Sequence, residues 1–405
     1  MSKRILFISD HGDPLAPLGT AQAGGQNNYV KHLALSLDNR EHSIDIFTHW
    51  SNPLTPQIEH FGTNCRVIRV AAGRKEYVAK TDMYSILPAF LKEMQHLEDL
   101  SKYDVMHTHY WLSGLLGSQI SSRYSVPWIH TSHSLGIAKQ QATGVTEPRR
   151  LKAEQMILAS ADTVIATTKT EAALIKATVK NPSPIRIIPI GVDEVFKPDA
   201  AIARNPFTFT YAGRLEETKG IYTLIRAFKL LQYSGLVSSP LKLQIIGGEK
   251  SQVDASTGKA VSDKLKAATS GIENQIEFLG SRPPHELARL FRSSTAVIVP
   301  SYYESFGMVA AEAQACGTAV IASKVGGLGD IVLHRETGLQ VEPSNIKELA
   351  SSMGLLANRF DIAENLGEQA AKFAQEHFKW KAIAKKMEKL YERIGYEVNN
   401  TPVSN

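Results

Sequence analysis

The sequence of 405 residues lacks most features that would place it in a specialised class of protein. Its only cysteines are Cys65 and Cys316, too few for a disulfide framework or a cysteine metal site. Such sparse cysteine is typical of a reducing compartment, so we expect a cytoplasmic protein. No apolar run approaches the ~18 residues of a membrane span. The N-terminus also lacks the long apolar region of a signal peptide.

Strong charge of either sign is also missing. Lysine and arginine total 45 against 40 acidic residues, a net charge of +5. Because no dense basic block stands out, we expect no nucleic-acid partner. The mild excess is compatible with an anionic substrate or with loose contact with an anionic membrane surface. Nothing in the sequence indicates an oligomeric state.

Short apolar, β-branched segments alternate with helical patterns along the whole chain. We expect strands at 4–9, 43–48, 66–71, 104–108, 127–131, 163–167 and 185–189, then at 207–212, 242–246, 275–279, 295–299, 319–322 and 338–341. Helical patterns include 28–37, 151–160, 221–231 and 346–357. This alternation in each half predicts an α/β protein with two doubly wound domains built on parallel sheets.

The joint between the domains is expected in residues 191–205, which contain proline and charged residues. We therefore expect domains at 1–191 and 192–378. Residues 379–405 would hold a long helix at 380–394, followed by a polar end that is frayed from residue 397.

The segment Pro300 to Gly317 follows a buried strand and continues into an alanine-rich helical pattern. In open α/β sheets, ligands bind where strands end. Free N–H groups near Phe306, Gly307 and Met308 would face an anion or a hydroxyl-rich ligand.

Glu304 and Glu312 flank this turn. Eight helical residues would span ~12 Å, whereas hydrolytic carboxylate pairs lie roughly 5–9.5 Å apart. Two separate hydroxyl clusters, such as the ribose and the transferred sugar of a nucleotide sugar, therefore fit better than a catalytic pair. The alternative is a surface glutamate together with a glutamate on the face of the helix.

Other strand ends in the second half carry glycine and basic residues. Gly213 and Arg214 end one strand, and Lys219 opens the next helical pattern. Two cations beside a helix start suit a diphosphate and would stabilise a leaving phosphate without a metal ion. Gly247 and Arg282 follow neighbouring strands. A solvated basic loop is the alternative.

In the first half, Gly24 and Gly25 precede a helix, where backbone N–H groups can approach a ligand. Their spacing is not G-x-G-x-x-G, so a dinucleotide redox cofactor is not expected. Histidines end two strands, and alternation turns neighbours to opposite faces. We expect His107 and His130 to be neutral, satisfied core residues and His109 and His133 to be site candidates. No acidic third ligand is positioned, so no metal is expected.

These motifs together resemble the retaining nucleotide-sugar glycosyltransferases of family 4. The resemblance rests on Gly-Arg-Leu-x-x-x-Lys-Gly from Gly213 and on Glu-Ser-Phe-Gly-x-x-x-x-Glu from Glu304 to Glu312. It extends to the glycine pair and the histidine strand ends, and so covers nearly the whole chain. It implies the GT-B fold, in which two Rossmann-like domains face a central cleft and a C-terminal helix returns to the first domain.

The resemblance also implies site residues. Catalytic candidates are His133, Arg214, Lys219 and Glu304. The implied donor-binding set is Gly24, Gly25, Gly213, Arg214, Lys219, Gly247, Arg282, Glu304, Ser305, Phe306, Gly307, Met308, Val309 and Glu312. Within it, Arg214 and Lys219 would bind the diphosphate, Glu304 the transferred sugar and Glu312 the ribose.

Two branches of the family resemble this chain, the mycothiol-pathway inositol-phosphate N-acetylglucosaminyltransferases and the sucrose-phosphate synthases. The implied acceptor-binding set is Asn27, Lys80, His109, Tyr110, Ser134 and Arg150. Lysine, hydroxyl and arginine donors around one pocket suit a phosphomonoester. Ser134 stands where one branch has threonine, and Thr81 and Asp82 replace an acidic residue expected after Lys80, so the acceptor stays open.

The predicted function is therefore retaining, metal-independent transfer of a hexosyl group from UDP-glucose or UDP-N-acetylglucosamine. The acceptor would be a small phosphorylated sugar or inositol phosphate, and no cofactor is expected. The alternatives are a glycan or lipid-linked acceptor, a sugar-nucleotide epimerase, a phosphorylase, or a non-catalytic sugar-nucleotide-binding subunit.

Overall fold

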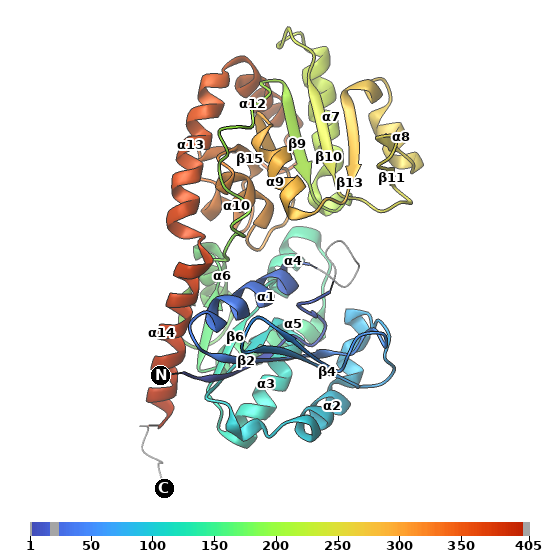
Figure 1. The fold of residues 1–405 in the computed structure, drawn as a ribbon. Helices are drawn as coiled ribbons and strands as arrows, with labels where there is room; N and C mark the ends of the chain where they lie inside the picture. The colour runs from blue at the N-terminus through green and yellow to red at the C-terminus, as the bar shows by residue number, and fades with distance from the viewer. Residues whose placement is uncertain (1, 17–23, 400–405) are drawn as a thin grey trace. The chain divides into compact units, whose positions relative to one another are not determined.

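The computed structural model describes residues 2–16 and 24–399, the last five as backbone only. The chain forms two compact units, Met1–Gly191 with Trp380–Asn405, and Val192–Lys379. Each unit is an open α/β sheet with helices on both faces (Figure 1). Two doubly wound domains, the fold class predicted from the alternating pattern, are thus confirmed.

The first unit is built on an eight-stranded sheet in the order β3-β4-β2-β1-β5-β6-β7-β8. All neighbouring strands are parallel except β3, which runs antiparallel to β4 at the edge. The strands are β1 (Arg4–Ile8), β2 (Ser43–His49), β3 (Ile58–Phe61), β4 (Cys65–Val70), β5 (Val105–His109), β6 (Trp128–Thr131), β7 (Thr163–Ala166) and β8 (Ile185–Ile187).

Helices cover both faces of this sheet because each presents an apolar side to it. They are α1 (Gly25–Asp38), α2 (Lys80–Leu97), α3 (Tyr110–Tyr124), α4 (Gly136–Thr143), α5 (Pro148–Ser160) and α6 (Lys169–Thr178), with a short 3₁₀ turn η1 (Leu100–Lys102). Helices α2, α3 and α5 pack together around one core of buried aliphatic and aromatic side chains.

The final helix α14 (Trp380–Asn399) packs against α1 and β5 of the first unit. The Trp380 ring stacks on His32 at 5.7 Å and meets Tyr29 edge-on at 5.6 Å. An ion pair between Arg40 and Glu388 adds a charged contact. The helix continues through the residues expected to fray from 397, so that expectation was wrong up to Asn399; residues 400–405 lie outside the described residues.

The second unit is built on a six-stranded parallel sheet in the order β13-β10-β9-β14-β15-β16. Its strands are β9 (Thr208–Ala212), β10 (Lys242–Ile246), β13 (Ile276–Gly280), β14 (Ala296–Val299), β15 (Ala319–Ser323) and β16 (Gly338–Val341). A small antiparallel hairpin of β11 (Val253–Asp254) and β12 (Lys259–Ala260) packs beside the edge strand β13.

Helices α7 and α12 cover one face of this sheet, and α10 lies on the other with α9 and α13 (Figure 1). Their bounds are α7 (Ile221–Tyr233), α8 (Asp263–Thr269), α9 (Pro284–Arg292), α10 (Met308–Ala315), α11 (Leu328–Ile331), α12 (Ile346–Asn358) and α13 (Phe360–His377), with 3₁₀ turns η2 (Glu217–Lys219) and η3 (Glu273–Gln275).

Candidate active site

Loops at one edge of the second sheet gather the predicted donor-binding residues. Strands β10, β9, β14 and β15 are parallel neighbours, so their carboxyl ends share that edge. The N–H of Tyr302, after β14, donates to the carbonyl of Thr218 at 2.9 Å. The N–H of Gly327, after β15, donates to the carbonyl of Glu304 at 3.0 Å. Backbone hydrogen bonds therefore fix three loops to one another.

Two glycines allow this close packing of loops. Gly220 has φ of +71°, and a Cβ there would overlap the carbonyl oxygen of Pro300. Gly247 has φ of +113°, and a Cβ there would overlap the carbonyl oxygen of Gly213. An L side chain is disfavoured at both positions by backbone conformation and by space.

An ion pair connects two of the predicted catalytic residues. Lys219 Nζ lies 2.6 Å from Glu304 Oε1, and the two side chains are 24% and 19% exposed. The Ser301 hydroxyl donates to the same Glu304 oxygen at 3.1 Å. Each partner is therefore held at the strand ends but keeps a solvent-accessible side.

The two predicted arginines of this unit are more exposed. Arg214 is 77% exposed and pairs with Glu216 at 3.0 Å. Arg282 is 30% exposed and pairs with Glu286 at 3.2 Å. Their partners are exposed or half-exposed carboxylates, so both guanidinium groups are available to an incoming anion at small cost.

Helix α10 begins in the glutamate turn. Its N-cap is Gly307, with φ of +97°. The Phe306 side chain is buried and packs edge-on against Phe378 at 5.7 Å, so Phe306 offers a ligand only its backbone. Ser305, Met308 and Val309 are partly exposed around the helix start. Helix α10 has eight residues, so its N-terminus carries the partial positive charge that can face an anion.

The two glutamates of the turn have different surroundings. The expectation of eight helical residues between them was wrong, because α10 starts only at Met308. Burial, aided by the negative charge of nearby Asp193, raises the pKa of Glu312 to about 8. Burial therefore favours the protonated form of Glu312, whereas Glu304 pairs with Lys219. The sequence offered no signal for the proximity of Asp193.

Four of the six predicted acceptor residues meet in the first unit. Tyr110 follows β5, and its ring lies 5.4 Å from Lys80 Nζ and 5.0 Å from Arg150 Cζ. Arg150 Nη2 donates to Ser134 at 2.6 Å (carbonyl) and 3.1 Å (hydroxyl). We call Lys80, Tyr110, Ser134 and Arg150 the acceptor cluster.

Two glutamates that sequence reasoning missed hold Arg150. Its side chain is 5% exposed and pairs with Glu154 at 2.7 Å and Glu147 at 3.2 Å. Glu154 also accepts from the N–H of Gly136 at 2.8 Å. The spacing of three and four residues on one helix could have revealed both pairs. Arg150 is therefore an already compensated cation that positions Ser134.

The predicted histidines form a buried group. His107 Nδ1 contacts the Tyr391 hydroxyl and His107 Nε2 the Thr131 hydroxyl, each at 2.8 Å. Burial holds the pKa of His107 well below its usual value, so the prediction of a neutral, satisfied core residue is confirmed. His130 is neutral as well, because burial lowers its pKa to about 3. Its Nδ1 contacts the Thr108 hydroxyl at 2.8 Å, whereas its Nε2 has no partner among the described residues, so the prediction of a satisfied His130 is confirmed for one ring nitrogen only.

His109 and His133 lie side by side, with 3.1 Å between His109 Nδ1 and His133 Nε2. Burial lowers the pKa of His133 to about 3, so it is neutral. His109 has no exposed surface, which contradicts direct contact with an acceptor; it positions His133 instead. His133 and Tyr110 have φ of +57° and +77°, uncommon for residues other than glycine and concentrated at functional sites.

The glycine pair opens α1. Asn27 is buried and caps the helix: its amide oxygen accepts from the N–H of Gly24 at 3.2 Å, and its nitrogen donates to the carbonyl of Asp13 at 2.8 Å. A Cβ at Gly24 or Gly25 would meet no heavy atom of the described residues within 4 Å. Packing therefore does not require glycine at either position.

Within the described parts of the chain, no group of three or more histidine, cysteine, aspartate or glutamate side chains is arranged to hold a metal ion. None of the helices in residues 2–16 and 24–399 has the length and hydropathy needed to cross a bilayer.

Comparison with known proteins matches both units to glycosyltransferase families. Residues 24–191 match the family described as glycosyl transferase 4-like domain, and residues 192–373 match glycosyl transferases group 1. The chain is 35% identical over 410 residues to the D-inositol 3-phosphate glycosyltransferase of Corynebacterium jeikeium, covering 96% of this chain and 97% of the relative.

Solved structures show the same fold. Sucrose-phosphate synthase from Thermosynechococcus elongatus superimposes with a TM-score of 0.88 at 33% identity, covering 98% of this chain and 100% of the other. Anabaena HepE, solved in complex with UDP and glucose, superimposes with a TM-score of 0.72 at 18% identity, covering 96% of this chain and all of HepE. At that identity, the second likeness supports the fold alone.

Proposed function

Because the chain belongs to the group 1 glycosyltransferases, we propose that it moves a hexosyl group from a nucleoside diphosphate sugar to a hydroxyl of a small phosphorylated acceptor. The proposed donors are UDP-glucose and UDP-N-acetylglucosamine. The proposed acceptors are an inositol phosphate and a sugar phosphate, the classes named by the Corynebacterium relative and by sucrose-phosphate synthase.

The acceptor cluster is the observation that carries this proposal. Lys80 and Arg150 both contact the Tyr110 ring, and Arg150 contacts Ser134. The Lys80 ammonium group and two hydroxyls, one of them positioned by Arg150, match the charge and the hydrogen-bonding demand of a phosphomonoester. Lys80 is exposed, which makes it the cation of the cluster that can reorient toward a phosphate.

The donor-binding residues support the nucleotide-sugar half of the proposal. Lys219 and exposed Arg214 would bind the diphosphate, and the N-terminus of α10 would face the same negative charge. Glu304, held between Lys219 and Ser301, would accept hydrogen bonds from hydroxyls of the transferred sugar. Glu312 would contact the ribose.

We propose a retaining reaction without a metal ion. The acceptor oxygen would bond to the anomeric carbon on the face from which the phosphate departs. The bond between that carbon and the phosphate oxygen breaks, and the acceptor proton passes to the departing phosphate. Lys219 and Arg214 would stabilise the charge that develops on it. Neutral His133 would orient the sugar through a hydrogen bond.

The test is an array of nucleotide sugars against inositol phosphates, hexose phosphates and their phosphate-free counterparts, with products identified by mass spectrometry. We expect product only with phosphorylated acceptors, an α-linked product from an α-linked donor by NMR, and unchanged rates in EDTA. Product with free glycans or lipid-linked sugars alone would overturn the assignment of the acceptor. An inverted product would overturn the mechanism.

A further inference from the structure

One pocket in the described part of the second unit is lined by none of the residues assigned to the proposed reaction. It has a volume of about 390 Å³ and is lined by the segment before β9, by Arg292 at the end of α9, by Cys316 after α10 and by α13. Ligand pockets have volumes of roughly 300–1,000 Å³. Helix α10 starts at the glutamate turn and ends at this pocket, so eight residues, ~12 Å of helix, separate the two.

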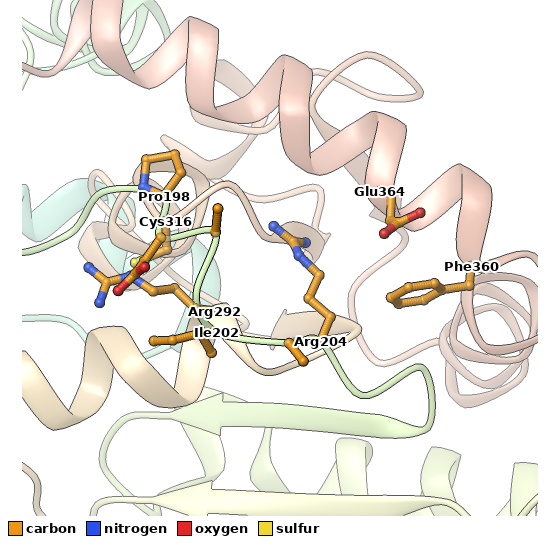
Figure 2. A pocket seen from close by; sticks show the side chains of 10 residues that line it. Pro198, Ile202, Arg204, Arg292, Cys316, Phe360 and Glu364 are labelled. Atoms are coloured by element: carbon orange, nitrogen blue, oxygen red, sulfur yellow. The ribbon is translucent and has the colours of Figure 1, made fainter.

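Arg204 is the most informative residue of this pocket. Its Nη2 donates to the carbonyl of Gly317, whereas its Nη1 is buried and has no hydrogen-bond partner among the described residues. A guanidinium nitrogen left unpaired in a buried position is costly. In Figure 2 the Arg204 side chain extends from its segment toward α13, which carries Phe360 and Glu364.

A second arginine lines the same pocket. Arg292 donates from Nε to the carbonyl of Lys197 at 2.7 Å and from Nη2 to the carbonyl of Val195 at 2.5 Å. Neither Arg204 nor Arg292 forms an ion pair with a carboxylate of the described residues. Carbonyl oxygens hold both guanidinium groups in place without a direct carboxylate partner among the described residues.

The acidic residues of the pocket do not neutralise these arginines. Asp199 and Glu364 are exposed, and Asp199 already accepts from the N–H of Ala201 at 3.0 Å. Burial lowers the pKa of Arg204, and the carboxylates of Glu364 and Glu368 offset this only in part. The Cys316 thiol adds no charge, because burial raises its pKa to about 12.

We propose that this pocket is a binding site for a small phosphate-bearing anion, separate from the glycosyl-transfer site. The phosphoryl group would bind the guanidinium groups of Arg204 and Arg292, both of which line the pocket. The rest of the volume, with Phe360 and Ile202 as apolar walls, admits an organic group attached to the phosphate. Inorganic phosphate and an organic phosphate share this chemistry, and the experiment below separates them.

The test is calorimetric titration of the full chain with inorganic phosphate and, separately, with glucose 1-phosphate, at constant ionic strength. Phenylglyoxal labelling with peptide mass spectrometry then measures protection of Arg204. We expect saturable binding with protection of Arg204. Tighter binding of glucose 1-phosphate identifies an organic phosphate as the ligand, and equal affinity identifies the phosphate ion.

Variants show whether the phosphate binds in this pocket or at another cationic position of the chain. Arg204→Gln should weaken binding about tenfold or more, as expected for loss of a charge-assisted hydrogen bond. Glu364→Gln removes an exposed negative charge and should tighten binding about two- to fivefold. Arg359→Gln, a matched exposed arginine paired with Asp361 outside the pocket, should change nothing. Lys80→Ala should also leave this binding intact.

Three results would overturn the proposal: no saturable binding, equal affinity in Arg204→Gln and the native protein, or loss of all binding in Lys80→Ala. The last would place the phosphate at the acceptor cluster instead. If Arg204→Gln does not fold, Glu364→Gln decides, because an affinity that does not rise in this exposed variant contradicts the site.

Discussion

The ion pair of Lys219 and Glu304 allows the donor-site assignment to be tested in detail. Lys219→Met keeps the unbranched side chain and removes the charge. The partners are 2.6 Å apart and mostly buried, at 24% and 19% exposure. Among the described residues, loss of the cation leaves the Glu304 carboxylate with the Ser301 hydroxyl as its partner, at a cost of about 1–3 kcal/mol in the free energy of unfolding. The same change removes a cation from the leaving phosphate and should lower kcat about 10²–10³-fold.

The assay combines initial rates at saturating donor with urea unfolding for Lys219→Met, Glu304→Gln and the double variant. A double-mutant cycle separates the pair's coupling from each single effect. Lys264→Met is the matched control, because Lys264 pairs with Glu217 at 3.1 Å but both are more than half exposed. It should change the free energy of unfolding little, because exposed ion pairs contribute little, and should leave kcat unchanged. If kcat of Lys219→Met stays within about threefold of the native value, a change under 1 kcal/mol, the assigned role is refuted.

Three further predictions concern other parts of the two units. Gly25→Ala should leave the midpoint of thermal unfolding unchanged or slightly raised, because no described atom lies within 4 Å of a Cβ there. The same variant should lower kcat/KM for the donor. A lower midpoint would instead show that Gly25 is needed for packing. The pKa of Glu312 is about 8 in the folded protein against an ordinary value of 4.5. Between pH 4.5 and pH 8 the folded protein therefore binds one more proton than the unfolded protein, and the free energy of unfolding falls as the pH rises. Glu312→Gln should flatten that slope by up to about 1.4 kcal/mol per pH unit, measured by urea unfolding at pH 6 and pH 8; an unchanged slope would contradict the raised pKa. Glu154→Gln should lower the free energy of unfolding by about 1–3 kcal/mol, because it removes a carboxylate partner from the buried Arg150 guanidinium. Glu147 is more exposed, so Glu147→Gln should lower it by less than about 1 kcal/mol. Equal losses in the two variants would be inconsistent with the different burial of the two ion pairs.

The fold was largely predictable because buried parallel strands have a strong local signature. Apolar, β-branched runs of four to six residues located every strand of the two main sheets except β3. The edge strand β3 and the hairpin of β11 and β12 were missed. β3 alternates between exposed and partly buried residues, and the two hairpin strands have only two residues each. Neither carries the buried pattern by which strands are recognised in a sequence.

The sequence allowed candidate site residues to be chosen by their place at strand ends, but it did not predict their contacts. The sequence placed Lys219 and Glu304 at neighbouring strand ends, yet their ion pair depends on loop packing around Gly220. Similarly, the sequence indicated that His109 follows a strand. It did not indicate that His109 lies beside His133 and has no exposed surface. Such contacts join residues far apart in the chain, and local periodicity carries no information about them.

Two further features could not be predicted from the sequence for the same reason. They are the proximity of Asp193 to Glu312 and the unpaired Arg204 Nη1. Each arises from the approach of the segment before β9 to the helices of the second unit. A sequence gives the charges of these residues but not their solvation, and solvation decides both the pKa of Glu312 and the cost of leaving Arg204 unpaired.

The central claim is that the acceptor is recognised by its phosphate. The most direct measurement compares kcat/KM for the phosphorylated acceptor and its phosphate-free counterpart, in the native protein and in Lys80→Ala. A charged phosphate held by Lys80 and its neighbours should favour the phosphorylated acceptor about 10²-fold or more, consistent with charge-assisted hydrogen bonds of about 1.5–3 kcal/mol each. We predict that Lys80→Ala loses most of this preference while the rate with the phosphate-free acceptor barely changes. An equal preference in both proteins would contradict the claim.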